Sequence, residues 1–325
     1  MNSWSTKAND NSAFRENVLS KLDLDILCLN ETFLAHDEVI DIPNYKWYGH
    51  NRKNKHKKAR RGAGGVGILV HSRVHEYFNI QVLDAETEDI LWIKLQLKNS
   101  NTCICLCTCY LPPKGSSHKV DAETFFDTIT NHIYNYQNKG FICICGDINS
   151  RMGDHQDIIE GVDNVPLRSS IDNNCNEYGD LFRTHLTNCN MCVLNGRQGN
   201  SQYTCISNKG KSVVDYTWVP HEQLHYWSNF VHWPSVSNLS VRSTRVEYEG
   251  DACHPLAFTL HQAPHIIPDD PQVFSNIHVV LLHSHMDRLP LQSPVRVFTR
   301  NLVLPWQNSR EAISEIQQNT RTKCE

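Results

Sequence analysis

The sequence has no apolar run that approaches the roughly 20 residues a membrane-spanning helix needs. Its first residues, Met1 to Asn11, are polar and lack the apolar core of a signal peptide. Positive charge is not in excess either, because 31 Lys and Arg face 35 Asp and Glu, for a net charge of −4. That balance excludes a uniformly basic nucleic-acid coat but allows a local basic patch. These absences predict an intracellular protein, nuclear or cytoplasmic, that is neither secreted nor bound to a membrane.

Two ligand-binding motifs are missing as well. The glycine-rich stretch 64–70 is not followed by Gly-Lys-Ser/Thr and does not open a helix with GxGxxG, so it is neither kind of phosphate-binding loop. It is typical of a strand whose glycines permit close packing. Cys189 and Cys192 form the one CxxC motif, without a second pair at zinc spacing. We therefore expect no small-molecule cofactor and no structural zinc.

Cysteine, by contrast, is abundant, with 13 in 325 residues. Four of them alternate along Cys103–Cys109, which is the periodicity of a strand and places all four on one face. Neighbours on one strand face are ~7 Å apart, which is farther than the Cα atoms of a disulfide. The pattern predicts small apolar side chains in a reducing compartment rather than a disulfide framework.

The remaining composition, 40% hydrophobic and 20% charged, is typical of a folded protein. Apolar runs predict strands at 24–29, 45–48, 64–70, 78–83, 90–97, 102–110, 141–145, 203–206, 213–219 and 256–260. Amphipathic spacing predicts helices at 14–22, 121–136 and 179–186, and 150–178 is a polar connection. This mixture predicts an α/β layered domain at 1–260. Residues 261–325, rich in proline and weakly periodic, predict a tail of low regularity with one short helix at 310–317.

Acidic, amide and histidine side chains recur at the ends of the apolar runs. Strand ends are where a layered fold gathers side chains into one site. Carboxylate and amide oxygens suit Mg²⁺, and a histidine among carboxylates suits work on a phosphate ester. Each residue alone also fits a plainer role, such as a turn residue, a strand-end charge or a solvated histidine. The candidates are Glu31, Asp147, Asn149, Asp215, Asp251 and His254.

A basic run at 51–61 carries seven Lys and Arg residues. It fits a contact with the DNA backbone beside the site, which would be sensitive to salt. It fits equally well a solvated loop between strands or a nuclear targeting segment. The candidate phosphate contacts in it are Arg52, Lys53, Arg60 and Arg61.

Five short motifs carry a family resemblance: Leu29–Thr32 (LNET), Tyr110–Pro113 (YLPP), Gly146–Arg151 (GDINSR), Ser212–Tyr216 (SVVDY) and Asp251–Pro255. In this order they resemble the endonuclease/exonuclease/phosphatase superfamily over residues 12–260. The stretch 61–70 and the YLPP form look most like the apurinic/apyrimidinic-type endonuclease domains of non-LTR retrotransposons. The resemblance implies a DNase I-like fold, a four-layered α/β sandwich of two packed mixed β-sheets flanked by helices.

The resemblance also implies a metal and a water site. Glu31 matches the family's ligand of the catalytic Mg²⁺, for which Mn²⁺ is an alternative. Asp251 resembles the aspartate of the family's Ser-Asp-His motif and is assigned to the same metal. Asp147 and Asn149 match the GDxN pair, in which the aspartate activates or orients the attacking water and the asparagine holds water or phosphate.

The implied phosphate contacts come from three other motifs. His254 matches the histidine that binds a phosphate oxygen, and Asp215 matches the aspartate that orients it. Tyr110 matches a tyrosine that contacts the scissile phosphate. Ser212 adds a further phosphate contact.

Two departures from the family pattern stand out. The family begins with a strand that carries an asparagine near the metal, and this first strand is apparently truncated here, which would expose the edges of its neighbours. The family also places its histidine directly after the aspartate, whereas Ala252 and Cys253 separate Asp251 from His254. Either a bulge brings both residues into the site, or Asp251 does not reach it.

These inferences predict a Mg²⁺-dependent phosphodiesterase whose partner is DNA, or RNA. The leading hypothesis is a DNA endonuclease that nicks one strand and leaves a 3′-hydroxyl, as in the resembled retrotransposons. One alternative is another phosphoesterase of the superfamily, acting on RNA tails, lipids or inositol phosphates. The other is a catalytically dead truncated copy that acts only as a binding domain.

Overall fold

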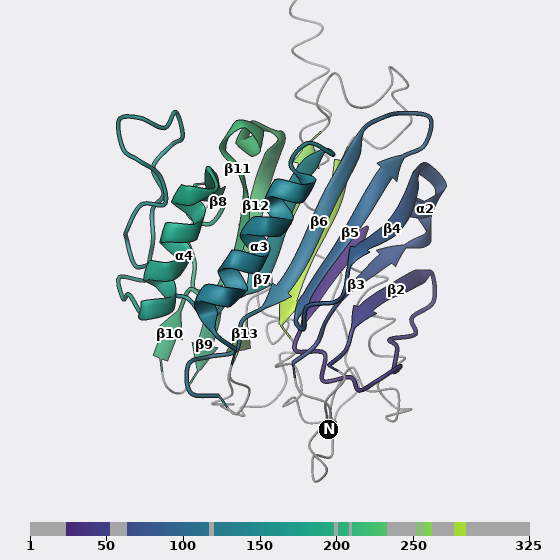
Figure 1. Ribbon diagram of the computed structural model, residues 1–325, viewed down its shortest axis with the longest axis horizontal. Coiled ribbons are helices and arrows are strands. Elements are labelled where there is room, and N and C mark those ends of the chain that lie inside the picture. Colours follow the sequence, from purple (N-terminus) through teal and green to yellow (C-terminus); the bar gives the residue numbers. More distant parts are fainter. Residues whose placement is uncertain are drawn as a thin grey trace, which may run out of the picture. The chain divides into compact units, whose positions relative to one another are not determined.

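Apolar strands form most of the ordered structure, with helices beside them (Figure 1). The computed structural model describes residues 24–52, 64–116, 120–197, 201–207, 210–232, 252–253, 256–261 and 276–283. All of these fall in one unit, made of 1–235 and 247–289. A second unit, 236–246 and 290–325, lies outside the described residues.

Most of the strands that the structure describes follow predicted apolar runs, and five do not. They are β1 Ile26–Asn30, β2 Tyr45–His50, β3 Val66–His71, β4 Phe78–Asp84, β5 Ile90–Leu97, β6 Cys103–Tyr110, β7 Phe141–Asp147, β8 Met191–Val193, β9 Cys205–Ser207, β10 Gly210–Ser212, β11 Asp215–Pro220, β12 Trp227–His232, β13 Ala252–Cys253, β14 Leu256–His261 and β15 Asn276–His283. The helices are α2 Ser72–Tyr77, α3 Ala122–Tyr136, α4 Glu177–Asn188 and the 3₁₀ helix η1 His221–Tyr226.

Two six-stranded mixed sheets form the framework. The first sheet has the order β12-β14-β15-β1-β3-β2, and the second has the order β4-β5-β6-β7-β11-β8. Each contains one parallel pair, β1 with β15 and β6 with β7, and its other neighbours are antiparallel. A small sheet of three strands, β10-β9-β13, accompanies them. The predicted class, two packed mixed sheets with helices, is confirmed.

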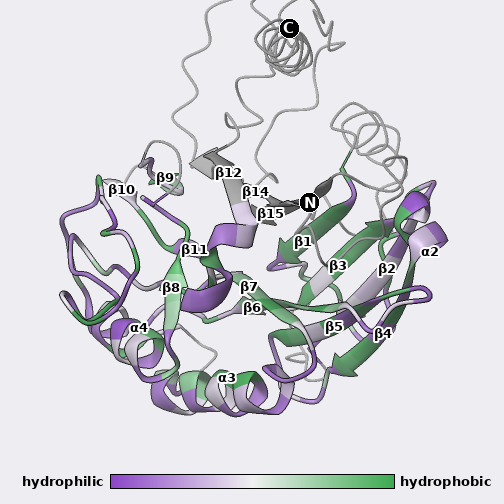
Figure 2. Ribbon diagram, turned by 90° about the horizontal axis from the view of Figure 1, so that it is seen from above, coloured by the Kyte–Doolittle hydropathy of each residue, from purple (hydrophilic) through white to green (hydrophobic). Residues whose placement is uncertain are grey.

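The two large sheets pack face to face, and α3 and α4 cover the outer face of the second one (Figure 2). Alternation along each strand divides its side chains between two layers. On β6, Ile104, Leu106 and Tyr110 face the first sheet, whereas its four cysteines face the helices. The predicted shared face of those cysteines is therefore confirmed. Every cysteine whose side chain the structure describes is a free thiol.

Both long helices begin where the sequence supplies a capping residue. Asp121 accepts a hydrogen bond from the Thr124 amide at 2.8 Å at the start of α3. Asn176 accepts one from the Gly179 amide at 2.7 Å at the start of α4. Such caps satisfy donors that have no partner inside the helix. The cap at Asn176 also accepts from the amide of Arg151 at 2.9 Å, and so joins α4 to the segment that follows β7.

The sheet includes a strand from the region predicted to be an irregular tail. β15 lies between β14 and β1, parallel to β1 and antiparallel to β14. Residues 276–283, which lie in the stretch 261–325 expected to be of low regularity, thus form a strand of the first sheet. The side of β1 that was expected to be open is paired with β15.

Several other expectations fall on residues outside the described ranges, among them the helices at 14–22 and 310–317 and the first strand. Sequence analysis did not predict α2, β12 or the short strands β8, β10 and β13. Within the described part of the chain, no helix has the length and apolar character that a membrane span requires.

The buried His185 of α4 makes the fold sensitive to acid. Its ring stacks on Phe126 and Phe182, and its Nδ1 lies 2.9 Å from Thr130 Oγ1. Burial lowers the pKa of His185 from 6.5 to about 3. The unfolded chain therefore binds this proton first, so stability present above pH 6.5 is lost as pH falls toward 3.

We expect this histidine alone to cost about 2 kcal/mol of unfolding free energy between pH 7 and pH 5. Urea unfolding at the two pH values measures the loss. His185→Gln has no ring to protonate, so its stability should fall less over the same interval. An identical fall in both proteins would contradict the assignment.

Candidate active site

Polar side chains gather where β1, β6 and β7 end and β11 begins. Tyr110 pairs with Asp147 in register, and Asp147 pairs with Asp215. Paired residues share a face, and Tyr110 belongs to the layer between the two large sheets. Asp147 and Asp215 therefore also face the first sheet, whose Glu31 follows the end of β1. All four residues are buried.

Two hydrogen bonds join the sheets at this end. Tyr110 Oη donates to Glu31 Oε1 at 2.5 Å. One layer deeper, Thr108 Oγ1 donates to Asn30 Oδ1 at 3.0 Å. Glu31 has a positive φ of 50°, so the backbone leaves the extended strand conformation at this residue. These contacts fix the Glu31 carboxylate against the end of β6.

The electrostatics agree with this convergence. Burial raises the pKa of the Tyr110 phenol well above its ordinary value, and the negative charges of Glu31 and Asp147 raise it further. Tyr110 is therefore a neutral hydroxyl that donates a hydrogen bond throughout the physiological range. Both carboxylates act on one phenol, so they belong to the same site.

Asn149 is held in the turn after β7. Its backbone has φ 47°, its amide nitrogen donates to Asp147 Oδ1 at 3.0 Å, and its Nδ2 donates to the Leu111 carbonyl at 2.9 Å. Asparagine tolerates this left-handed conformation better than most residues. The GDIN motif thus places Asp147 and Asn149 on one tight turn beside the end of β6.

Asp215 is fixed from both sides by neighbouring loops. Its amide and that of Val214 both donate to Thr204 Oγ1, at 3.1 and 2.9 Å. Its carbonyl accepts from Asn195 Nδ2 at 3.0 Å. These bonds determine where β11 starts, and so where the carboxylate lies.

The remaining predicted residues are placed less completely. Ser212 ends β10 and pairs with Cys205 in the small sheet. Asp251 and His254 lie outside the described residues, and the strand between them, β13, pairs with β9 of the same sheet. Lys53, Arg60 and Arg61 are also outside the described residues.

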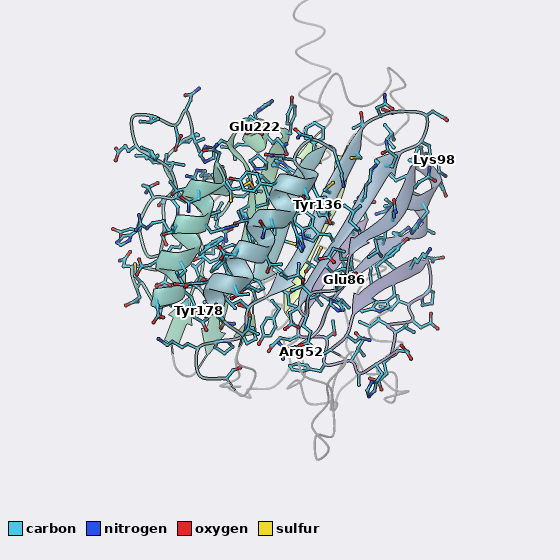
Figure 3. The ribbon with its side chains drawn as sticks, in the orientation of Figure 1. Arg52, Glu86, Lys98, Tyr136, Tyr178 and Glu222 are labelled. Atoms are coloured by element: carbon cyan, nitrogen blue, oxygen red, sulfur yellow. The ribbon has the colours of Figure 1, made fainter. Side chains whose placement is uncertain are left out.

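Arg52 differs from its predicted role as a DNA contact. Its side chain is 3% exposed and forms an ion pair with Asp89, which is 1% exposed. Arg52 Nε donates to Asp89 Oδ2 at 2.8 Å, and the Gly65 amide donates to Oδ1 at 2.7 Å. Figure 3 shows Arg52 at the lower end of the strands, whereas Lys98, which follows β5, lies at their upper end. The prediction that Arg52 contacts DNA is therefore corrected. Arg52 pairs with Asp89, and the same carboxylate binds the Gly65 amide of the glycine-rich segment.

This pair also supports the site. The Asp89 carbonyl accepts from the Tyr110 amide at 2.9 Å. Burial raises the pKa of the Asp89 carboxyl, while Arg52 and the Gly65 amide act against that rise. The buried Arg52–Asp89 pair is therefore joined, through the Asp89 carbonyl, to the backbone of Tyr110, the residue that carries the site's phenol.

The polar connection from 150 to 176 is anchored by two further Arg–Asp pairs. Arg151 Nε donates to Asp172 Oδ2 at 2.9 Å, and the Val213 amide donates to the same oxygen at 2.9 Å. Arg197 Nη1 and the Val193 amide share Asp157 Oδ2 in the same way. Each carboxylate ties a loop to the start or end of a strand. The connection is therefore fixed at Asp157 and again at Asp172.

The donor set fits a hard divalent cation. Glu31 and Asp147 supply carboxylate oxygens, and Asn149 supplies an amide oxygen on the same turn as Asp147. Among the described residues, no three His, Cys, Asp or Glu side chains form a preorganised cage. Mg²⁺ does not need one, because it keeps several waters and binds through one or two carboxylates.

Two site residues were missed by sequence analysis. Asn30 was read only as part of the LNET motif, and its buried side chain proves to bridge the sheets. Thr108 is its partner. The signal for Thr108 is present in the sequence, since it is the one aliphatic hydroxyl in the run CICLCTCY and alternates onto the same inner face as Tyr110.

Comparison with known proteins identifies the family. The model of the Endonuclease/Exonuclease/phosphatase family matches residues 2–240. The chain therefore belongs to this family, as its motifs predicted. None of the curated proteins compared with it matches.

Solved structures with a similar fold include nucleases. The endonuclease domain of TRAS1, a telomere-specific non-LTR retrotransposon, is 14% identical, with a TM-score of 0.49 over 68% of this chain and 84% of that one. The 3′-5′ exonuclease NExo from Neisseria meningitidis is 12% identical, with a TM-score of 0.46 over 77% and 96%. The human nocturnin catalytic domain is 15% identical, with a TM-score of 0.42 over 71% and 82%.

Proposed function

We propose that the chain is a Mg²⁺-dependent DNA endonuclease that nicks one strand and leaves a 3′-hydroxyl. The observation that carries this proposal is the convergence of Glu31, Tyr110, Asp147 and Asp215 at one end of the layer between the sheets. Phosphodiester hydrolysis needs a positioned water, neutralised phosphate oxygens and a stabilised leaving oxygen. Buried carboxylates beside a neutral phenol are suited to that chemistry.

The residues take distinct roles in this proposal. A bound Mg²⁺, held by Glu31 with Asp251 as a further ligand, would neutralise charge on the phosphate and leaving oxygens. Asp147 orients the attacking water and accepts its proton, and Asn149 holds that water or the phosphate. Mn²⁺ would substitute for Mg²⁺, because both accept oxygen ligands.

A second set of residues would contact the other side of the phosphate. Tyr110 stays protonated, and its one hydroxyl hydrogen, which goes to Glu31 in the structure, would turn to a phosphate oxygen when DNA binds. Asp215 orients His254, which binds a phosphate oxygen, and Ser212 adds a hydroxyl. The basic residues Lys53, Arg60 and Arg61 would follow the DNA backbone, and this contact would weaken as salt rises.

Incubation with supercoiled plasmid tests the proposal. With Mg²⁺ we expect conversion to the open circle, and with EDTA no conversion. DNA ligase should reseal the nick, because the ends are a 3′-hydroxyl and a 5′-phosphate. An unsealable nick would contradict the proposed end chemistry.

Two other outcomes would replace the proposal. Hydrolysis of RNA or a phosphomonoester without plasmid nicking would indicate another phosphoesterase of the family. A gel shift of DNA without cleavage in either Mg²⁺ or Mn²⁺ would indicate a binding domain that has lost catalysis.

A further inference from the structure

The inner face of the second sheet carries polar side chains in two successive rows across β6, β7 and β11. The first, which we call the site row, consists of Tyr110, Asp147 and Asp215. The second, the floor row, lies two residues deeper on each strand and consists of Thr108, Cys145 and Thr217. Side chains two residues apart on a strand share a face. The floor row therefore lies directly beneath the site row.

The floor row is polar within an otherwise apolar layer. The next residues inward on the same face belong to the apolar core, and they are Leu106, Cys143 and Val219. From the facing sheet, Asn30 meets the floor row at Thr108. Asn30, Thr108 and Thr217 are all completely buried. Because a buried polar group is unfavourable unless it is hydrogen-bonded, each of these side chains needs a partner.

Hydrogen bonds within the chain satisfy only part of this layer. Thr108 Oγ1 donates to Asn30 Oδ1 at 3.0 Å, and Cys145 Sγ donates to the Cys107 carbonyl at 3.4 Å. In the part of the chain that the structure describes, neither Asn30 Nδ2 nor Thr217 Oγ1 has a hydrogen-bond partner. Buried polar atoms of this kind are commonly satisfied by ordered internal water. The two atoms offer such water an amide donor and a hydroxyl.

The spacing of the two rows suits a single layer of water. Side chains two residues apart on one strand face are ~7 Å apart, and two hydrogen bonds through one water span about 5.6 Å. A water at Thr217 Oγ1 therefore reaches the carboxylate of Asp215 in the row above. A carboxylate has about four acceptor sites, so Asp215 accommodates this water together with other partners.

We propose that Asn30 and Thr217 hold internal water between the two rows, and that this water fixes the carboxylates of the site row. Asn30 and Thr217 are then positioning residues, because they act through the water and do not touch the substrate. Carboxylates that are held from beneath keep their orientation before DNA binds, which lowers the reorganisation needed for the reaction. The positioning role rests on the proposed function, whereas the water site does not.

A crystal structure of the full-length wild type that resolves ordered water tests the water site. We expect water within hydrogen-bond distance of Thr217 Oγ1 and of Asn30 Nδ2. Thr217→Val keeps the shape of the side chain and removes the hydroxyl, so the water at this residue should be lost from its crystals. A wild-type structure in which either atom has no water would overturn the proposal.

Plasmid nicking at saturating Mg²⁺ tests the positioning role. We expect Thr217→Val to lower kcat by about 10–100-fold, the usual effect of removing a group that orients an active-site ligand, and to leave KM for the plasmid unchanged. Thr217→Ser keeps the hydroxyl and should restore most of the lost rate. Thr184→Val is the control for the exchange itself, because Thr184 is exposed on α4 and its hydroxyl bonds the Asp180 carbonyl of the same helix.

The outcomes separate the two proposals. Equal kcat values for Thr217→Val and Thr184→Val, or no rescue by Thr217→Ser, would overturn the positioning role. A wild type that does not nick would overturn the proposed function and the positioning role with it, while the crystal structure decides the water site. If Thr217→Val fails to fold, Thr217→Cys takes its place, since a thiol is a weaker donor and acceptor than a hydroxyl.

Discussion

Replacing Asp147 with alanine is expected to lower the rate of plasmid nicking by about 10²–10⁴-fold, the usual contribution of a positioned acid or base. Asp147 ends β7 and faces the site, and its carboxylate accepts a hydrogen bond from the Asn149 amide. Removing it would take away the group that we propose orients the water, and it loosens the turn that carries Asn149. Initial rates at saturating Mg²⁺ measure the effect.

The fold should survive this change. The backbone of Asp147 keeps its hydrogen bond with the Leu111 amide, and little core volume is lost. Asp163→Ala is a matched control, since Asp163 also caps a backbone amide, that of Ile159, but on an exposed loop. Nicking by Asp147→Ala within threefold of this control would refute the role of Asp147.

The largest expected effect on stability is that of Arg52→Ala. The substitution leaves Asp89 buried and without its cation, which typically costs about 3–5 kcal/mol of unfolding free energy. The Gly65 amide would still donate to that carboxylate, but it carries no positive charge. Urea unfolding at pH 7 measures the loss.

An exposed ion pair provides the comparison. Lys114 and Glu177 form one with side chains that are 70% and 63% exposed. Lys114→Ala should therefore cost less than about 1 kcal/mol, as is usual for surface pairs. Equal costs for Arg52→Ala and Lys114→Ala would show that the buried pair does not stabilise the fold.

Arg52→Ala should also disturb the geometry of the candidate active site. Asp89 holds the Tyr110 amide through its carbonyl. Freeing this segment would let the phenol move away from Glu31.

Much of the site was predictable because its residues terminate uninterrupted apolar runs. CICLCTCY and FICICGD each read as a buried strand, so Tyr110 and Asp147 had to lie where these strands end. Their parallel pairing then brings them together without any information from elsewhere. The glycine and the asparagine of GDIN marked the turn.

The rest depended on partners that are distant in sequence. Arg52 lies 37 residues from Asp89, and within its basic run it has the composition of a solvated segment. β15 was missed because histidines interrupt its apolar pattern within a proline-rich region. Asn30 gained its role from Thr108 on the other sheet, 78 residues away. Local pattern predicts elements well, but such cross-sheet pairs arise only in the folded structure.

The buried thiols on the central strands β6 and β7 determine at which stage the protein is open to oxidation. β6 presents four of them to the helical layer, and β7 presents two to the opposite layer. Once the sheets have closed, an oxidant has no path to these sulfurs. Before closure it does, and a sulfinic group formed then is irreversible and too polar for either layer. Oxidative damage should therefore act on newly made or unfolding chains and spare those already folded.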